Sequence, residues 1–187
     1  MTTLIAGLGN IFNGDDGFGV EVAASLLKKT WPDDVEVADF GIRGVHLAYQ
    51  LLDGYELVVI VDAVSRGGEP GTLYVIEHRP DEGRPLQLES EPMIDAHDLG
   101  PDGVLALVPS LGGKLGRVVV VGCEPESLAP GVGLSAAVAG SVESAIELVG
   151  EIVQHARVGS RVRPEATDDA ETDQHAALAR HRGRSSS

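Results

Sequence analysis

Short apolar runs of strand length alternate with segments of helical periodicity along this chain, and this alternation constrains the fold more than any other feature. The most hydrophobic run is Leu57-Val58-Val59-Ile60-Val61, which follows a helical segment at 45–52. Continuous apolar runs of this length are typical of strands that are buried on both faces of a parallel sheet. The sequence therefore predicts an α/β fold with helices on both faces of the sheet.

The predicted elements form a single three-layer α/β/α domain whose twisted, mostly parallel sheet has about five strands. The strand at 71–76 follows the strand at 57–61 after a short connection, 65–70, which has no room for a helical crossover. We therefore expect this strand to be antiparallel and near an edge of the sheet. The expected strands are 3–8, 35–38, 57–61, 71–76 and 117–122, and the expected helices are 18–30, 45–52, 101–108 and 135–154.

Length and charge limit the organisation and the partners of the chain. Its 187 residues, of which 43% are hydrophobic, suit one domain, predicted at 1–156, and a disordered tail at 157–187 that has few large apolar groups. The net charge is −15, and residues 1–156 alone carry −16. Such a surface repels phosphate, so nucleic acid is not an expected partner.

Compartment is predicted from the cysteine content and from the absence of long apolar stretches. Cys123 is the only cysteine, which excludes an internal disulfide and agrees with a reducing environment. No apolar run is long enough to span a bilayer, and no basic segment precedes the first strand. We expect a cytoplasmic protein without membrane insertion.

Two carboxylates and one imidazole are predicted to meet at one edge of the sheet. Asp16 follows the first strand and Asp62 ends the third, so both face the crevice beyond the carboxyl ends of the strands. His97 ends a polar loop at 79–96 and can reach the same edge. One nitrogen and two oxygen ligands suit a borderline divalent ion such as nickel or zinc.

Other acidic residues near this edge have simpler interpretations. Asp15 is expected to cap the helix that begins near Phe18, which is a common use of acids at helix N-termini. Glu124 and Glu126 follow the fifth strand, but no partner can be assigned to them, and we place them on the rim. Asp62 differs from these residues because it follows five apolar residues, where burial of a lone carboxylate is costly unless it has a function.

Several sequence blocks resemble those of the hydrogenase maturation endopeptidases, and they occur in the family's order over roughly residues 3–153. Any one block is weak, because Gly-x-Gly-Asn is common, but five in register over a matching α/β pattern are specific. The blocks are Gly7-Leu8-Gly9-Asn10 with Gly14-Asp15-Asp16-Gly17-Phe18-Gly19, Asp62-Ala63, Gly71-Thr72-Leu73, His97-Asp98-Leu99-Gly100, and the stretch Gly122-Cys123-Glu124-Pro125-Glu126-Ser127-Leu128 with Gly131-Val132-Gly133-Leu134-Ser135.

This resemblance implies an endopeptidase that removes the C-terminal extension of a nickel–iron hydrogenase large-subunit precursor after nickel insertion. It implies that Asp16, Asp62 and His97 are both the metal-contacting and the catalytic set, in an aspartic-type or metal-assisted hydrolysis. The nickel would be carried by the substrate, and no organic cofactor is implied. The sequence contains neither a Gly-x-Ser-x-Gly elbow nor a His-Glu-x-x-His helix.

One segment departs from the family pattern. Where the family has Asp-Gly-Gly-Thr-x-Gly, this chain has Asp39-Phe40-Gly41-Ile42-Arg43-Gly44. We assign Asp39, Gly41 and Arg43 to substrate contact, because the loop lies at the same edge of the sheet. An exposed arginine that begins a helix explains Arg43 equally well, so both interpretations of this residue stay open.

Three other classes of protein share parts of this pattern. A dinucleotide-binding module has Gly7-x-Gly9 after a strand and an acid like Asp39, but Phe12 replaces the third glycine and acids stand where the pyrophosphate would bind. Peptidyl-tRNA hydrolases also open with Gly-Leu-Gly-Asn, but no histidine precedes His46 here. A nickel-binding maturation chaperone without catalytic activity would keep the same three ligands, and the sequence does not exclude it.

Overall fold

A single five-stranded sheet organises the part of the chain that the structure, a computed structural model, describes: residues 1–78 and 99–161. Its strands are β1 (Thr3–Leu8), β2 (Val35–Gly41), β3 (Leu57–Ala63), β4 (Leu73–His78) and β5 (Arg117–Cys123), in the order β2-β1-β3-β5-β4. All neighbouring pairs are parallel except β4 and β5, which are antiparallel. The predicted fold class and the antiparallel edge strand are therefore confirmed.

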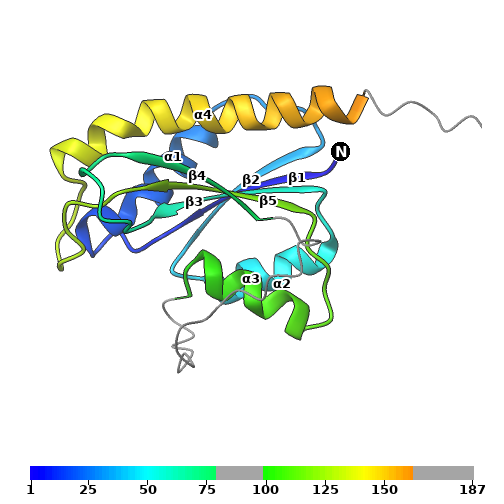
Figure 1. Cartoon of the computed structure of the whole chain (residues 1–187), viewed down its shortest axis with the longest axis horizontal. Helices are drawn as coiled ribbons and strands as arrows, with labels where there is room; N and C mark the ends of the chain where they lie inside the picture. The colour runs from blue at the N-terminus through cyan, green and yellow to red at the C-terminus, as the bar shows by residue number, and fades with distance from the viewer. Residues whose placement is uncertain (79–98, 162–187) are drawn as a thin grey trace, which may run out of the picture.

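Helices cover both faces of the sheet (Figure 1). One face carries α1 (Phe18–Leu26) and α4 (Ala136–Arg161), and the other carries α2 (Gly44–Gln50) and α3 (Pro101–Ser110). Two short 3-10 helices, η1 (Gly14–Gly17) and η2 (Leu51–Asp53), complete the described elements. Successive residues of each strand contribute alternately to the two cores, with Ile5 and Val59 under α1 and α4, and Leu4 and Val58 under α2 and α3.

Two glycines explain why η1 and α1 can lie so close to the sheet. A Cβ on Gly19 would stand 2.2 Å from the backbone oxygens of both Leu8 and Val61, which no side chain can do without moving a strand. Gly9 has a φ of +126°, and a Cβ there would stand 1.8 Å from the backbone oxygen of Asp16. The glycine motif thus holds η1, and Asp16 with it, directly against the end of β1.

The last helix is longer than the sequence predicted. We expected it to end near Gln154 and a disordered tail to begin at 157, but α4 continues to Arg161. Ala156 packs against the core beneath α1 and α4, and Arg157 pairs with Asp34 from the loop before β2. These contacts join segments far apart in sequence, so the helical pattern alone did not reveal them. The helix thus runs past the predicted domain boundary at 156, and the division into a domain and a tail stays a prediction.

Other element ends also differ slightly. The first helix ends at Leu26 instead of Thr30, and Trp31 turns back to donate from Nε1 to the Leu26 carbonyl at 3.0 Å. The predicted loop 79–96, His97 and residues 162–187 of the tail lie outside the described residues. Among the helices that the structure describes, none combines the length and the apolar character needed to cross a membrane.

Candidate active site

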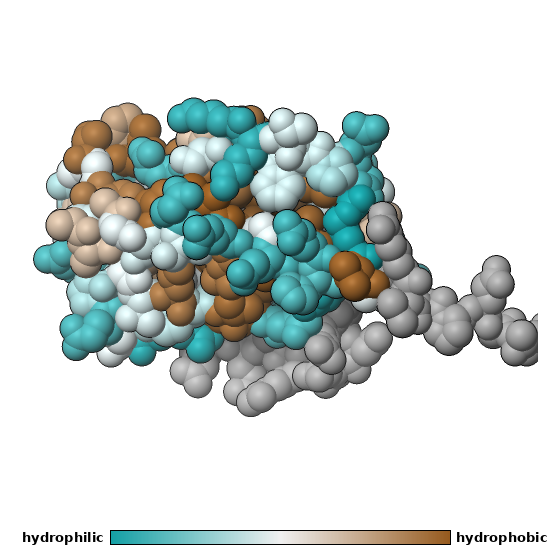
Figure 2. Space-filling model, turned by 90° about the horizontal axis from the view of Figure 1, so that it is seen from above, coloured by the Kyte–Doolittle hydropathy of each residue, from teal (hydrophilic) through white to brown (hydrophobic). Residues whose placement is uncertain are grey.

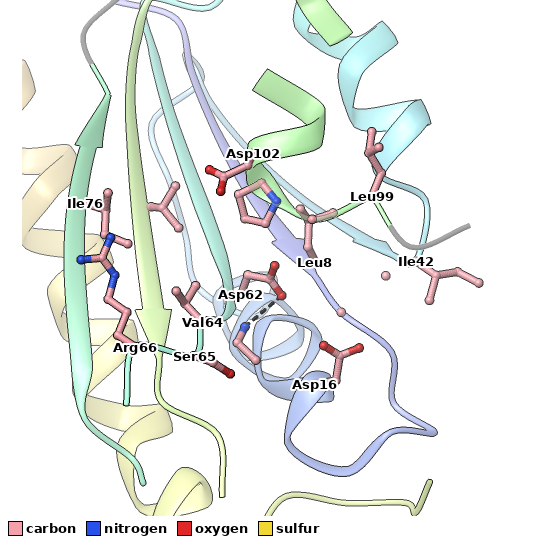
Figure 3. Close-up of a pocket in the computed structure, with 16 residues that line it drawn as sticks. Leu8, Asp16, Ile42, Asp62, Val64, Ser65, Arg66, Ile76, Leu99 and Asp102 are labelled. Carbon is pink, nitrogen blue, oxygen red and sulfur yellow. Dashed lines mark hydrogen bonds between the residues drawn. The ribbon is translucent and has the colours of Figure 1, made fainter. Parts of the chain in front are cut away.

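Asp16 and Asp62 line the same cavity at the carboxyl ends of the strands, where both were expected from their places after β1 and near the end of β3 (Figure 3). Asp16 is in η1, directly after β1, and Asp62 is near the end of β3, the next strand in the sheet. The cavity has a volume of about 370 Å³. Two segments 46 residues apart in sequence therefore present carboxylates to one space that is large enough for a short stretch of peptide.

Local hydrogen bonds orient both carboxylates. The amide of Asn10 donates to Asp16 Oδ2 at 2.8 Å, which ties the carboxylate to the turn after β1. The amide of Ala63 donates to Asp62 Oδ1 at 2.9 Å, and Asp62 is only 6% exposed. Gly100 lies beside Asp62, since a Cβ on it would stand 3.9 Å from Oδ2. The absence of a side chain at Gly100 keeps the approach to this carboxylate open.

The third predicted ligand, His97, lies outside the described residues. Within residues 1–78 and 99–161, no three His, Cys, Asp or Glu side chains gather closely enough to hold a metal ion. The described chain resumes at Leu99, and Leu99 and Gly100 both line the cavity. Asp102, at the start of α3, adds a third carboxylate to its wall that the sequence did not single out.

The three residues assigned to substrate contact belong to one segment, where β2 ends and the loop to α2 begins, but they line two different hollows. Gly41 lines the cavity with Asp16 and Asp62, and its φ of +53° is stabilised by a hydrogen bond from its amide to Asp39 Oδ1. Asp39 and Arg43 line a separate groove of about 530 Å³ beside β2 and α2. The guanidinium of Arg43 donates to the carbonyls of Phe40 and Asp39, so it shapes this loop.

Asp15 has a different partner from the one predicted. It does not cap α1, which has no side-chain cap. Its buried carboxylate accepts hydrogen bonds from the amides of Glu126, Ser127 and Ser135, at 2.8, 3.0 and 2.6 Å. Burial raises the pKa of Asp15, but these three amides outweigh the effect and leave the pKa below its ordinary value. Asp15 fastens the loop after β5 and the start of α4 to the loop that carries Asp16.

Glu124 is also not the rim residue that we predicted. It is 6% exposed, and its carboxylate accepts hydrogen bonds from the Arg66 amide at 2.8 Å, the Gly67 amide at 3.1 Å and the Tyr74 hydroxyl at 2.8 Å. Burial raises the pKa of Glu124, and these hydrogen bonds more than reverse that effect. Glu124 thus fixes the loop after β3, which supplies Ser65 and Arg66 to the cavity wall.

Apolar side chains gather on the surface at the same end of the molecule, seen in Figure 2 as brown atoms on the left. The loop after β1 and the loop after β5 meet there, because the Gly131 amide donates to the Phe12 carbonyl at 2.8 Å. Large apolar residues that these loops expose are Ile11, Phe12, Leu128 and Val132. An exposed apolar surface beside a cavity is typical of a protein-binding site.

The fold and this cavity define an α/β protein with a carboxylate-lined site at the switch point of its sheet. A family model described as hydrogenase maturation protease matches residues 20–152. A Methanocaldococcus jannaschii protein provisionally named as such a protease is 39% identical over 154 residues, covering 80% of this chain and 95% of that protein. The hydrogenase 2 maturation protease of Escherichia coli is 32% identical over 150 residues, covering 80% and 88%.

A solved structure agrees with these matches. The hydrogenase maturating endopeptidase HybD from Escherichia coli superposes with a TM-score of 0.69 and 30% identity, covering 83% of this chain and 94% of HybD. The chain belongs to the hydrogenase maturation protease family. It is therefore assigned to a family of peptide hydrolases that act in hydrogenase maturation, and the resemblance drawn from its sequence motifs is confirmed. The dinucleotide-binding and peptidyl-tRNA hydrolase alternatives have no support from these matches.

Proposed function

We propose that this chain removes the C-terminal extension of a nickel–iron hydrogenase large-subunit precursor after nickel has been inserted. The observation that carries the proposal is the meeting of Asp16 and Asp62 in one cavity at the end of β1 and β3. Carboxylate oxygens bind divalent ions, and an imidazole nitrogen beside them would favour nickel or zinc over magnesium or calcium. The nickel belongs to the substrate, so binding it would select precursors that already contain the metal.

His97 completes the proposed ligand set. Leu99 and Gly100, two and three residues after it, line the cavity, which supports its inclusion. Asp16, Asp62 and His97 would grip the nickel centre and hold the scissile peptide beside it, lowering the barrier chiefly by positioning. A carboxylate of the cavity would take a proton from the attacking water, or the substrate's nickel would polarise that water. We propose the cytoplasm as the compartment.

The proposed partner is a whole protein, and the surface around the cavity supports this choice. The exposed apolar side chains of the loops after β1 and β5 offer a docking surface that a free peptide would not need. The departure from the family pattern at Phe40 and Ile42 lies at the same edge of the sheet. We propose that this loop influences which hydrogenase precursor is accepted.

Cleavage by site variants tests the proposal. Nickel-loaded precursor is incubated with the wild-type protein and with Asp16→Asn, Asp62→Asn and His97→Ala, and loss of the C-terminal peptide is followed by mass spectrometry. We expect each variant to fold, by circular dichroism, and to cleave at least about a hundredfold more slowly, as when a positioning contact is lost. Precursor that binds but is never cut by wild-type protein would instead indicate a nickel-centre-binding chaperone.

A further inference from the structure

Among the residues that the structure describes, one basic side chain lines the cavity of Asp16 and Asp62. Arg66 is the only Lys or Arg among the described residues of its wall, in a chain whose net charge is −15. Figure 3 shows Arg66 beside Ile76 at one side of the cavity and Asp16 at the other, with Asp62 between them. Asp16 and Asp62 form an acidic side of the cavity and Arg66 forms a basic side, while Asp102 lies above them in the view. A ligand with only one kind of charge would not use both sides.

Arg66 is held in place at both of its ends. One buried carboxylate, that of Glu124, accepts the Arg66 amide at 2.8 Å and the Tyr74 hydroxyl at 2.8 Å. The guanidinium carbon of Arg66 lies 5.9 Å from the centroid of the Tyr74 ring, within the range of a cation–π contact. Gly68 allows this approach, because a Cβ there would stand 2.2 Å from the Tyr74 hydroxyl oxygen. Glu124 thus positions both the backbone of Arg66 and the ring that its guanidinium covers.

The guanidinium itself stays available for a ligand. Within residues 1–78 and 99–161 it forms no ion pair, and the oxygens of Glu124 are occupied by backbone amides and by Tyr74. Arginine remains charged at any physiological pH and presents its donors in a planar fork. That fork matches a carboxylate, which can accept two parallel hydrogen bonds from it.

We propose that Arg66 is a binding subsite for a carboxylate in the C-terminal extension of the substrate. This rests on the proposed function: the acidic side of the cavity faces the nickel centre, and Arg66 receives the segment that cleavage releases. Val64 lies between Arg66 and Asp62, and Ile76 lies beside Arg66, so apolar side chains border the guanidinium. Because the protein is strongly acidic, Arg66 also offsets the repulsion that a carboxylate would otherwise meet in this cavity.

Affinity for nickel-loaded precursor, measured by biolayer interferometry at low temperature, tests the subsite directly. We expect Arg66→Gln to raise Kd about tenfold, which corresponds to about 1.4 kcal/mol. Arg66→Lys is expected to restore part of the affinity, since it keeps the charge but not the fork. The matched control is Lys28→Gln, because Lys28 is exposed and follows the end of α1, at the edge of the sheet opposite the cavity. This variant should bind the precursor with the affinity of the wild type.

Changes to the precursor show whether Arg66 binds the C-terminal carboxylate of the extension or an acidic side chain within it. One precursor carries a C-terminal amide, installed by peptide ligation, and another has the acidic side chains of its extension replaced by Asn or Gln. The precursor that lacks the carboxylate bound by Arg66 should bind the wild-type protein about tenfold more weakly than the unmodified precursor does. The Arg66→Gln variant should bind these two precursors with the same affinity, because it cannot form the contact with either.

The same samples separate failure of this inference from failure of the proposed function. An unchanged Kd for folded Arg66→Gln would overturn the subsite. An Arg66 effect that persists in a third precursor carrying both changes would overturn it too. Cleavage is read separately by mass spectrometry. Binding that depends on Arg66 without any cleavage by the wild type would support the subsite while refuting the protease function.

Discussion

Replacing Asp15 by asparagine should destabilise the protein far more than the same change at the neighbouring Asp16. The Asp15 carboxylate accepts three amides, and asparagine has nearly the same shape but only one acceptor oxygen. At least one buried amide then loses its acceptor, at about 1–3 kcal/mol, and the other two lose charge assistance, at about 1 kcal/mol each. We therefore expect a loss of about 3–5 kcal/mol in the free energy of unfolding.

The carboxylate of Asp16 accepts the Asn10 amide, and the oxygen of an asparagine can still do so. Asp16 is also only half-buried, so water can solvate a group that loses a hydrogen bond there. We expect Asp16→Asn to lose about 1 kcal/mol or less in stability, while it loses cleavage activity. Urea denaturation followed by circular dichroism measures the two free energies. Equal losses in the two variants, or a loss below about 1 kcal/mol for Asp15→Asn, would refute the role of Asp15 as the fastening carboxylate.

The pH dependence of the Asp15 effect follows from the direction of its pKa. Because the folded-state pKa is lower than the unfolded value, the carboxylate stabilises the fold above about pH 4. That contribution is lost as the pH falls through the folded-state pKa. The stability gap between wild type and Asp15→Asn should therefore be constant from pH 5 to pH 7 and narrow below about pH 4. A gap that widens in acid would contradict this explanation.

Two further outcomes follow from the packing. Gly19→Ala should lower the free energy of unfolding, measured by urea denaturation, by about 1–3 kcal/mol or more, because its Cβ would meet two strand carbonyls at 2.2 Å. In Gly140→Ala, in α4, the Cβ meets nothing within 4 Å, so the free energy of unfolding should rise by about 1 kcal/mol. A destabilised Gly140→Ala would show that this comparison is wrong. Burial raises the pKa of Cys123 to about 11, so a thiol reagent at pH 8 should label it only after unfolding. Rapid labelling of the native protein would contradict its burial.

The fold could be predicted closely because its determinants are local. Continuous apolar runs identified the buried strands, and the short connection at 65–70 identified β4 as antiparallel to its neighbour in the sheet. The position of Asp62 at the end of a buried strand also followed from the sequence, since a strand end fixes the edge at which its residue lies. Element ends were less accurate, because Arg157 and Ala156 extend α4 through contacts with distant segments.

The partners of buried acids could not be predicted from the sequence. Asp15 binds amides 111 to 120 residues away, and Glu124 binds amides that precede it by 57 and 58 residues. No local pattern distinguishes such a carboxylate from a helix cap or a rim residue. Arg66 was missed for the same reason, since its place beside Tyr74 depends on how β4 pairs with β5. The motif Gly-Asp-Asp thus contains one structural and one proposed functional carboxylate.

In the proposed function, the protein cuts the hydrogenase large-subunit precursor only when the precursor contains nickel. The most direct measurement compares one hydrogenase large-subunit precursor in nickel-loaded and nickel-free form, each incubated with wild-type protein and analysed by intact-mass spectrometry. We predict loss of a C-terminal peptide from the nickel-loaded form alone. Equal cleavage of both forms would contradict recognition of nickel through Asp16, Asp62 and His97.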